Sequence, residues 1–436
     1  QTCALPIYEQ RACQTRRRVG RLFAYEKYEG GRSYQLVILG GKTGGKMAYS
    51  DYSYTALTQA EFFKAEAELI RFGERLAHSP SAKYLKDTLL AIDAIFAVRI
   101  AHDVMLPVVP LITAFDLSNW KYQGDADQGI RMQRPEFRPP VDSMDAIMQA
   151  IHYMQAIQWA AVVSQQDAAI TMETVLHLHE ILLSGKTGDN RYHGFRNYFL
   201  PHKKGSDPTM IPLEISELCA FASSESYSPL GQASIIHYSF EKIVPFDTMI
   251  DRTGLVLAFM PMFRRGLFPN GYMAPICWGA SIGREYRRKL KDSSRVDRTI
   301  GKGKDLREHW AVYNAQNTYL SVVLADSFLA VADKLRTKWR SQDLRIPAHS
   351  ALDKLLDLFL GNPELSTVRA AEIIGKSYGA TNEAMRQLVK VGIVREMAVD
   401  GRERIFVCRQ SAAMITDFVE KLIEMGDKAE LSGVRC

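Results

Sequence analysis

Residues His237 to Phe259 read HYSFEKIVPFDTMIDRTGLVLAF. Apolar residues at both ends of this stretch are typical of buried helices, and Pro245 interrupts the helical pattern between them. The stretch lies within a block of helical pattern that runs from Val141 to about Arg340. A helix N-terminus at the end of a loop is a natural site for an anion.

The segment upstream of this stretch is also predicted to be helical. Apolar residues recur there at three- and four-residue spacing, which indicates one buried helix face. These residues are Val175, Leu178, Ile181 and Leu182. His177 and His179 are two residues apart on the same helix, so they lie on different faces, and we interpret both as structural.

The order of these segments resembles the Fic family, whose signature reads H-P-F-x-[DE]-G-N-G-R-x-x-R at a loop that enters a helix. The family commonly carries His-x-x-Phe-Glu-x-Ile ahead of this signature, and the chain keeps that element at residues 237–243. Gly194 to Arg196 and Tyr198 to Leu200 resemble the family's β-hairpin flap, which holds the target segment. Trp310 to Trp339 resembles its closing helices. The resemblance spans residues 142–340 and implies a mainly α fold that transfers AMP from ATP, with Mg²⁺, to a protein hydroxyl.

The signature loop departs from the family at the positions that carry its chemistry. Val244 stands where the family has its histidine base, and a valine cannot accept a proton. Thr248 stands at the magnesium-binding acidic position, and Leu255 at the last arginine. The Gly-Asn-Gly run is replaced by Met249, Ile250 and Asp251. A carboxylate in place of the second glycine would meet a phosphate about 4 Å away at a cost of about 4 kcal/mol, for an effective dielectric of about 20.

A few residues could still act at this site. His237 or Asp247 could substitute for the missing base, although the base role needs a group within reach of the hydroxyl. Arg252 and Gly254 survive from the signature, so the resemblance implies nucleotide contacts for them; Arg252 could instead pair with Asp251 or Asp247. No metal site is predicted, and ATP with Mg²⁺ is expected only if the site is active.

The end of the chain predicts a winged helix-turn-helix domain over residues 351–410. The expected order is a helix at 351–360, a short helix at 368–374 capped by Thr367, a turn, a helix at 381–391 and a hairpin around residues 400–401. Polar and basic residues on the third helix and the hairpin could contact DNA, because Arg and Asn read base edges and Lys meets phosphates. They are Thr381, Asn382, Arg386, Lys390, Arg402 and Arg404. Glu383 and Glu403 oppose this interpretation, and protein docking is the alternative.

Length and composition set the domain plan. A chain of 436 residues, with 47% hydrophobic and 24% charged residues, is expected to form several domains. The expected parts are a hairpin and irregular segment at 1–58, helices and a linker at 59–140, a Fic-like domain at 141–340, the winged domain, and a C-terminal helix and tail at 411–436. Six scattered cysteines without a CxxC pair, and no membrane-spanning or signal segment, favour a cytoplasmic protein.

Three functions are compatible with these patterns. The first is a non-catalytic Fic-like protein that binds a protein partner through the flap near Tyr198, and DNA or protein through the winged domain. The second is an active nucleotidyl or phosphoryl transferase whose site is rebuilt from Asp247, His237 and Arg252. The third is a DNA-binding regulator in which the Fic-like part forms a homo-oligomer or senses a ligand. The net charge of +6 permits nucleic-acid contact without requiring it.

Overall fold

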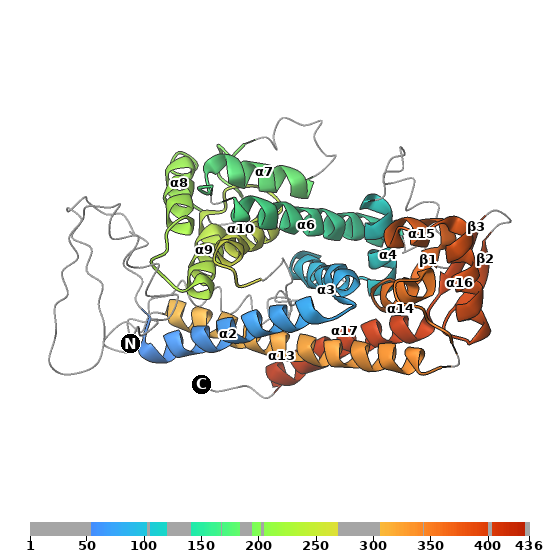
Figure 1. The fold of residues 1–436 in the computed structure, drawn as a ribbon. Helices are drawn as coiled ribbons and strands as arrows, with labels where there is room; N and C mark the ends of the chain where they lie inside the picture. The colour runs from blue at the N-terminus through green and yellow to red at the C-terminus, as the bar shows by residue number, and fades with distance from the viewer. Residues whose placement is uncertain are drawn as a thin grey trace, which may run out of the picture. The chain divides into compact units, whose positions relative to one another are not determined.

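The computed structural model describes residues 54–102, 105–119, 141–166, 168–183, 194–201, 205–268, 306–342, 344–399 and 403–431. The chain divides into two compact units, Gln1–Leu57 and Thr58–Cys436, and the description below concerns the second. Its fold is mainly α-helical, as predicted, with one small sheet in the described part (Figure 1). No described helix is long and apolar enough to cross a membrane.

Two buried helices form the centre of this unit. They are α9 (Pro229–Ile243) and α10 (Ile250–Arg264), which carry the stretch that the sequence singled out. Ser228 caps α9, because its side chain accepts a hydrogen bond from the Gly231 N–H. Pro229 suits the first helical position, where a backbone N–H would have no partner within the helix. A Cβ on Gly254 of α10 would lie 3.0 Å from the ring of Phe240, so glycine permits the close packing of α10 on α9.

Further helices cover this pair on several sides. α6 and α7 pack against α10, and α8 packs against α9. Their bounds are Val141–Gln165 for α6, Met172–Leu183 for α7 and Ile211–Ala222 for α8. α10 is thus buried along nearly its whole length, which is why it shows a continuous apolar run rather than a one-sided pattern.

The N-terminal helices join this centre through buried polar contacts. They are α2 (Ala56–His78), α3 (Ala82–His102) and α4 (Val108–Asn119). Glu66 of α2 accepts a 2.8 Å hydrogen bond from the Leu230 N–H, so its carboxylate lies at the positive end of α9. Burial raises the pKa of Glu66, and the bond to Leu230 partly offsets this shift. Tyr153 of α6 donates a 3.0 Å hydrogen bond to Asp93 of α3.

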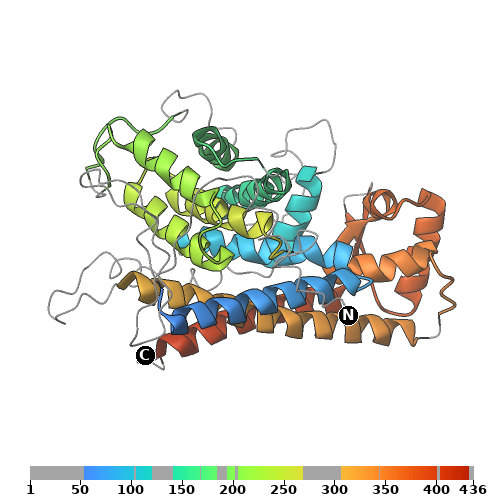
Figure 2. The same ribbon diagram turned by 60° about the vertical axis from the view of Figure 1, so that its left-hand side comes forward.

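The long helix α13 (Leu306–Arg340) joins the central pair to the C-terminal segment (Figure 2). At its start, Trp310 Nε1 donates to the Ser234 carbonyl of α9 at 3.0 Å. At its end, Trp339 Nε1 donates to Gln410 Oε1 at 2.9 Å. Gln410 belongs to α17 (Arg409–Leu431), which runs beside α13 and α4.

Helices and a three-stranded sheet alternate in the C-terminal segment. The helices are α14 (Ala351–Gly361), α15 (Thr367–Ile374) and α16 (Tyr378–Lys390), and the strands are β1 (Glu364–Ser366), β2 (Arg395–Val399) and β3 (Glu403–Val407). β3 lies in the middle and pairs antiparallel with both neighbours, with Phe406 opposite Leu365 on one side and Glu396 on the other.

The C-terminal segment is held tightly against the N-terminal helices. A Cβ on Gly361 would lie 2.6 Å from the Tyr84 carbonyl carbon, so only glycine allows α14 to approach α3 this closely. Thr88 Oγ1 donates to the Gly361 carbonyl at 2.9 Å. Arg369 of α15 forms a two-pronged ion pair with Asp116 of α4, at 2.7 and 2.6 Å. Residues 58–436 therefore form one unit, in which the C-terminal segment is a docked part.

Several expected features differ in detail from the structure. Residues 194–201 of the expected flap contain no strand, since every described strand lies in the C-terminal sheet. Ser366, rather than Thr367, caps α15, because its side chain accepts from the Arg369 N–H. The helix expected from Thr381 starts three residues earlier, at Tyr378, because Ser377 caps it. The expected hairpin within residues 1–58 and the proline-rich linker at 124–140 lie outside the described residues.

Candidate functional site: the loop between α9 and α10

The loop between the two central helices is bounded by two residues in the left-handed backbone conformation. Val244 ends α9 with φ 52°, and Met249 precedes α10 with φ 56°. This region is costly for a β-branched residue and is one that glycine enters freely. Met249 is the position that the resemblance aligns with the first glycine of the signature, so the backbone keeps the turn that such a glycine would favour.

Arg196, from the segment after α7, holds this loop from behind. Its Nε donates to the Val244 carbonyl at 2.6 Å, and Nη1 donates to the Tyr198 carbonyl at 2.7 Å. Nη2 donates to the Ser206 carbonyl at 2.7 Å and to the Ile243 carbonyl at 3.4 Å. The guanidinium is buried, and all four acceptors are backbone carbonyls. Arg196 therefore fixes the backbone path of the loop, which stabilises the left-handed turn at Val244.

An aromatic stack supports the middle of the loop. The imidazole of His179, from α7, lies flat on the ring of Phe246, with centroids 3.7 Å apart and an interplanar angle of 2°. Its Nε2 lies 3.3 Å from the Thr248 carbonyl. His179 is buried and His177 is exposed, which agrees with the predicted difference of face. Both remain structural residues in this geometry, and His179 is the one that touches the loop.

The outer side of the loop carries the one carboxylate that the sequence offered as a substitute base. Asp247 is exposed, and the Tyr198 hydroxyl donates a hydrogen bond to its Oδ2. Tyr198 and the neighbouring Phe199 are 44% and 70% exposed, so the segment resembling the flap presents aromatic rings beside the loop. A partner that contacts this side of the protein would meet these rings first.

The first turn of α10 contains an acidic and a basic residue that face each other. Arg252 is buried, its Nη1 donates to Gln149 of α6, and its Nε lies 3.8 Å from Asp251 Oδ2. Burial lowers the pKa of Arg252, and the charge of Asp251 offsets part of this shift. The alternative role predicted for Arg252, a salt bridge with Asp251, is therefore present. Gly254 faces α9, as described above, and does not line the loop.

The nucleotide that the family resemblance implies does not fit this arrangement well. A carboxylate already lies at the N-terminal turn of α10, where a phosphate would bind, and the nearby guanidinium points into the packing with α6. Asp247 is engaged by Tyr198 on the outer side of the loop. Within the described residues, no cluster of three or more His, Cys, Asp or Glu side chains could hold a metal ion.

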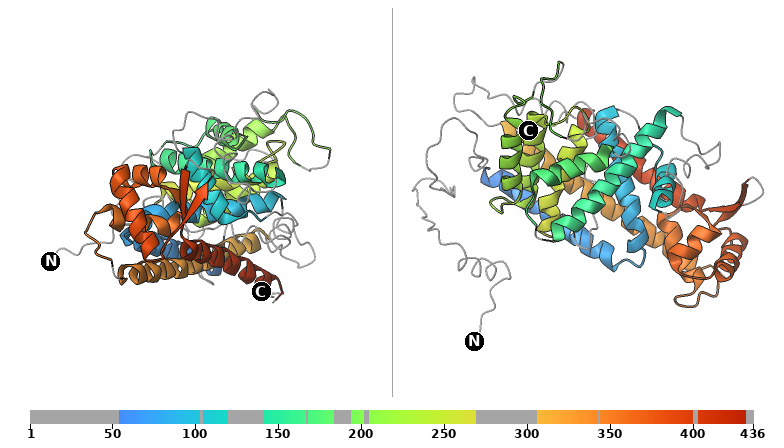
Figure 3. Two further views of the ribbon diagram at one scale, coloured as in Figure 1. Left: turned by 90° about the vertical axis from the view of Figure 1, so that its right-hand side faces the viewer. Right: turned by 90° about the horizontal axis from the view of Figure 1, so that it is seen from above.

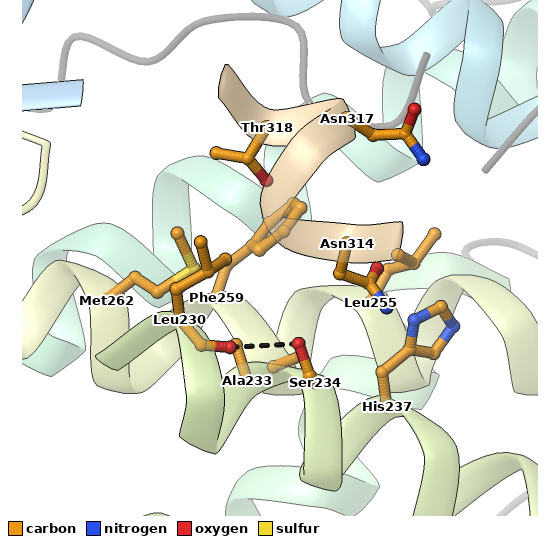
Figure 4. Close-up of a pocket in the computed structure, with 11 residues that line it drawn as sticks. Leu230, Ala233, Ser234, His237, Leu255, Phe259, Met262, Asn314, Asn317 and Thr318 are labelled. Carbon is orange, nitrogen blue, oxygen red and sulfur yellow. Dashed lines mark hydrogen bonds between the residues drawn. The ribbon is translucent and has the colours of Figure 1, made fainter. Parts of the chain in front are cut away.

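His237 of α9 lies in a pocket beside residues of α13, as Figure 4 shows. Its ring packs edge-on against Trp310 with centroids 5.5 Å apart. It lines a cavity of about 40 Å³ together with Ser234, Asn314 and Thr318, which is room for two or three water molecules. Burial lowers the pKa of His237 to about 3. Seven residues separate His237 from Val244, about 10 Å along the helix axis, and the ring of His237 packs on Trp310 rather than on the loop. The role of His237 as a substitute base stays a prediction.

The residues predicted to contact DNA are divided by the structure. Thr381 is wrong as an outward-facing residue: it is fully buried, and its Oγ1 donates to the Ser377 carbonyl at 2.9 Å. Thr381 lies three and four residues before the buried Ala384 and Met385, so helical spacing places it on the same inward face. Arg386 and Lys390 are exposed on α16, Asn382 is half-buried beside them, and Arg404 is exposed on β3. Arg402 lies outside the described residues.

Two residues important to the loop were not identified from the sequence. Arg196 was assigned to a flap, and nothing in its spacing indicated that it binds the carbonyls of residues far along the chain. His179 was interpreted as structural without a partner. The only signal for Arg196 in the sequence was its place in a Gly-Phe-Arg run.

These features define a helical domain with a signature loop between two buried helices, supported by an upstream helix and an arginine. Residues 169–261, which run from the segment before α7 to the end part of α10, match the model of the Fic/DOC family. Over this segment, about a fifth of the chain, the sequence is similar to the Fic/DOC family.

Solved structures of Fic proteins resemble the chain more loosely. A Fic family protein from Desulfovibrio desulfuricans G20 aligns with 13% identity and a TM-score of 0.44, over 82% of this chain and 97% of that one. Fic-1 (residues 134–508) from C. elegans aligns with 17% identity and a TM-score of 0.42, over 62% of this chain and 72% of that one. A Fic domain containing signaling protein from Bacteroides thetaiotaomicron aligns with 15% identity and a TM-score of 0.42, over 60% of this chain and 96% of that one. Comparison with curated protein sequences gives no match.

Proposed function

We propose that this Fic-like protein does not transfer AMP and instead acts as a regulatory binding protein. The observation that carries the proposal is Val244. This residue stands where the family has its base, and its aliphatic side chain is fully buried behind the loop that Arg196 fixes. A base contributes typically about 10²–10⁴-fold to such a reaction, and a buried valine contributes none of it.

The charge at the start of α10 supports the same proposal. Helix N-termini attract anions, and here the carboxylate of Asp251 supplies the negative charge from within the chain. A phosphate placed beside it would be repelled by about 4 kcal/mol, for a separation of about 4 Å and an effective dielectric of about 20. Arg252, which could have compensated, is already directed to Asp251 and Gln149.

The binding surfaces follow from what remains exposed. Tyr198 and Phe199 offer aromatic rings beside the loop, which suits a protein partner. The C-terminal order of α14, β1, α15, α16, β2 and β3 has the form of a winged helix-turn-helix, in which α16 takes the place of the recognition helix. We interpret this segment as the second binding surface, for DNA or for protein. A homo-oligomer stays a prediction.

An active transferase is the second candidate, and one observation favours it. Asp247 is an exposed carboxylate on the loop, and it already accepts a hydrogen bond from the Tyr198 hydroxyl. A target hydroxyl that displaced Tyr198 would meet the same oxygen. This candidate requires Asp247 to act alone, since His237 faces the cavity at α13.

Incubation with ATP and Mg²⁺, labelled in parallel on the α- or the γ-phosphate, separates the two candidates. We expect no labelling of the purified protein with either compound, and no labelling of a cell extract beyond that seen in the extract alone. Label from the α-phosphate would indicate AMP transfer, and label from the γ-phosphate would indicate phosphoryl transfer. Either signal, if lost in Asp247→Ala and kept in Asp417→Ala, an acidic residue on α17, would refute the non-catalytic proposal.

A further inference from the structure

The outer face of α16 carries a regular stripe of polar side chains. Tyr378, Asn382, Arg386 and Lys390 follow one another at four-residue spacing, so they lie along one slowly turning side of the helix. Tyr378 is 55% exposed, and the Arg386 side chain is 65% exposed. From Tyr378 to Lys390 the helix rises about 18 Å, which is long enough to cross a major groove about 12 Å wide.

The surroundings of α16 leave this stripe open. The helix packs on α14 and α15, and its buried residues there include Ala384, Met385 and Leu388. The β2–β3 hairpin lies in the same segment and carries Arg404 on its exposed surface. Figures 1 and 3 show α16 and the hairpin at the end of the unit that is remote from α9 and α10. No other described helix packs along the stripe.

Arg386 and Arg404 each have an acidic neighbour. Arg386 Nη1 lies 3.7 Å from Glu383 Oε2, and Arg404 Nε lies 3.3 Å from Glu396 Oε1. Exposed pairs of this kind are weak, so each arginine can leave its carboxylate when a better acceptor is available. The O6 and N7 acceptors of a guanine bind the guanidinium fork at two points. The carboxylates meanwhile lower the affinity of this surface for phosphates in general.

We infer that α16 binds duplex DNA in the major groove, with Arg386 on a guanine and Asn382 on an adjacent base, and with Glu383 limiting binding to unrelated sequences. This inference rests on the proposed regulatory function and names its C-terminal partner. Lys390, at the far end of the stripe, meets a phosphate. An acidic protein surface would also attract Arg386 and Lys390. Attraction between charges alone does not require Asn382 one helical turn before Arg386, and Glu383 would repel such a surface.

The test is selection of binding sites from a random duplex pool by the full-length protein, followed by affinity measurements on the selected site. We expect a short enriched motif that contains a guanine. Arg386→Ala should lose roughly 5- to 150-fold in affinity and its preference for that guanine. Lys390→Ala should weaken binding to all sequences and reduce the salt slope by about one. Glu383→Gln should tighten binding to unrelated DNA by roughly 2- to 5-fold.

Arg71→Ala is the matched control. Arg71 is also an exposed helical arginine paired with a glutamate three residues before it, Glu68, but it lies on α2. Its affinity for the selected site should equal that of the native chain. The inference is overturned if no motif is enriched, if Arg386→Ala behaves as Arg71→Ala does, or if polyglutamate competes as well as the selected duplex. ATP labelling is measured on the same samples, so failure of DNA binding and failure of the non-catalytic proposal are distinguished.

Discussion

Replacing Gly361 by alanine should undock the C-terminal segment from α3. The added Cβ would lie 2.6 Å from the Tyr84 carbonyl carbon and 3.0 Å from Thr88 Oγ1, whereas ordinary contacts begin at 3.4 Å. Because the obstacle includes backbone atoms of α3, no side chain can rotate away to relieve it. The helices must separate, and the Thr88 Oγ1 bond to the Gly361 carbonyl is then lost.

The expected magnitude follows from these contacts. Overpacking costs typically about 1–3 kcal/mol, and a lost buried hydrogen bond costs about 1 kcal/mol. Alanine is a better helix former than glycine, which offsets at most about 1 kcal/mol at this last position of α14. We therefore expect Gly361→Ala to lower the free energy of unfolding by about 2–3 kcal/mol.

Urea unfolding, followed by circular dichroism and tryptophan fluorescence, measures this difference. Gly379→Ala is the control, because a Cβ there meets nothing within 4 Å on exposed α16. We expect Gly379→Ala to be neutral or to stabilise the protein by up to about 1 kcal/mol through helix propensity. Equal stability of Gly361→Ala and the native chain, or a shift of the same sign and size in both variants, would refute the steric argument.

Three further predictions concern the loop and its surroundings. Arg196→Leu should destabilise the protein by about 3 kcal/mol or more in the same unfolding assay, because four backbone carbonyls, two of them in buried bonds, lose a charged donor. Tyr198→Phe should change stability by less than about 1 kcal/mol. Asp251→Asn should bind ATP more tightly than the native chain in calorimetry, since it removes the carboxylate from the start of α10; an unchanged affinity would contradict this. Burial lowers the pKa of His237 to about 3, against about 6.5 in the unfolded chain. Between these values the unfolded chain binds a proton at His237 and the folded chain does not. The contribution of His237 to stability is therefore complete above about pH 6.5 and is lost as the pH falls towards 3. About 2 kcal/mol should be lost by pH 5, and His237→Leu should reduce the slope of stability against pH in this window.

The sequence was sufficient for features that depend on local patterns. The central stretch is helical on both sides of Pro245, as the helical block and the family resemblance implied, and the different faces of His177 and His179 follow from helical spacing alone. The three helices expected in the C-terminal segment lie within three residues of their predicted bounds and a hairpin follows them, whereas β1 was not expected.

Features that depend on contacts between distant residues were not predictable in the same way. The start of α16 was placed three residues late, since Ser377 as the cap competes with Thr381 on equal terms in the sequence. The contact of His237 with Trp310 of α13 joins residues more than sixty positions apart in the sequence. Arg196 bonds to the carbonyls of Val244 and Ser206, which belong to two other parts of the chain. The spacing of residues in the sequence does not indicate such contacts.

The way in which Arg196 holds the loop has a consequence for what can be built there. Its acceptors are carbonyl oxygens, which every amino acid supplies, so exchanging the side chains of residues 243, 244, 198 or 206 leaves the acceptors in place. The shape of the turn is thus encoded outside the turn itself. Such a scaffold tolerates the loss of its reactive groups, and it offers a prepared frame into which an imidazole and two glycines could be reintroduced one at a time.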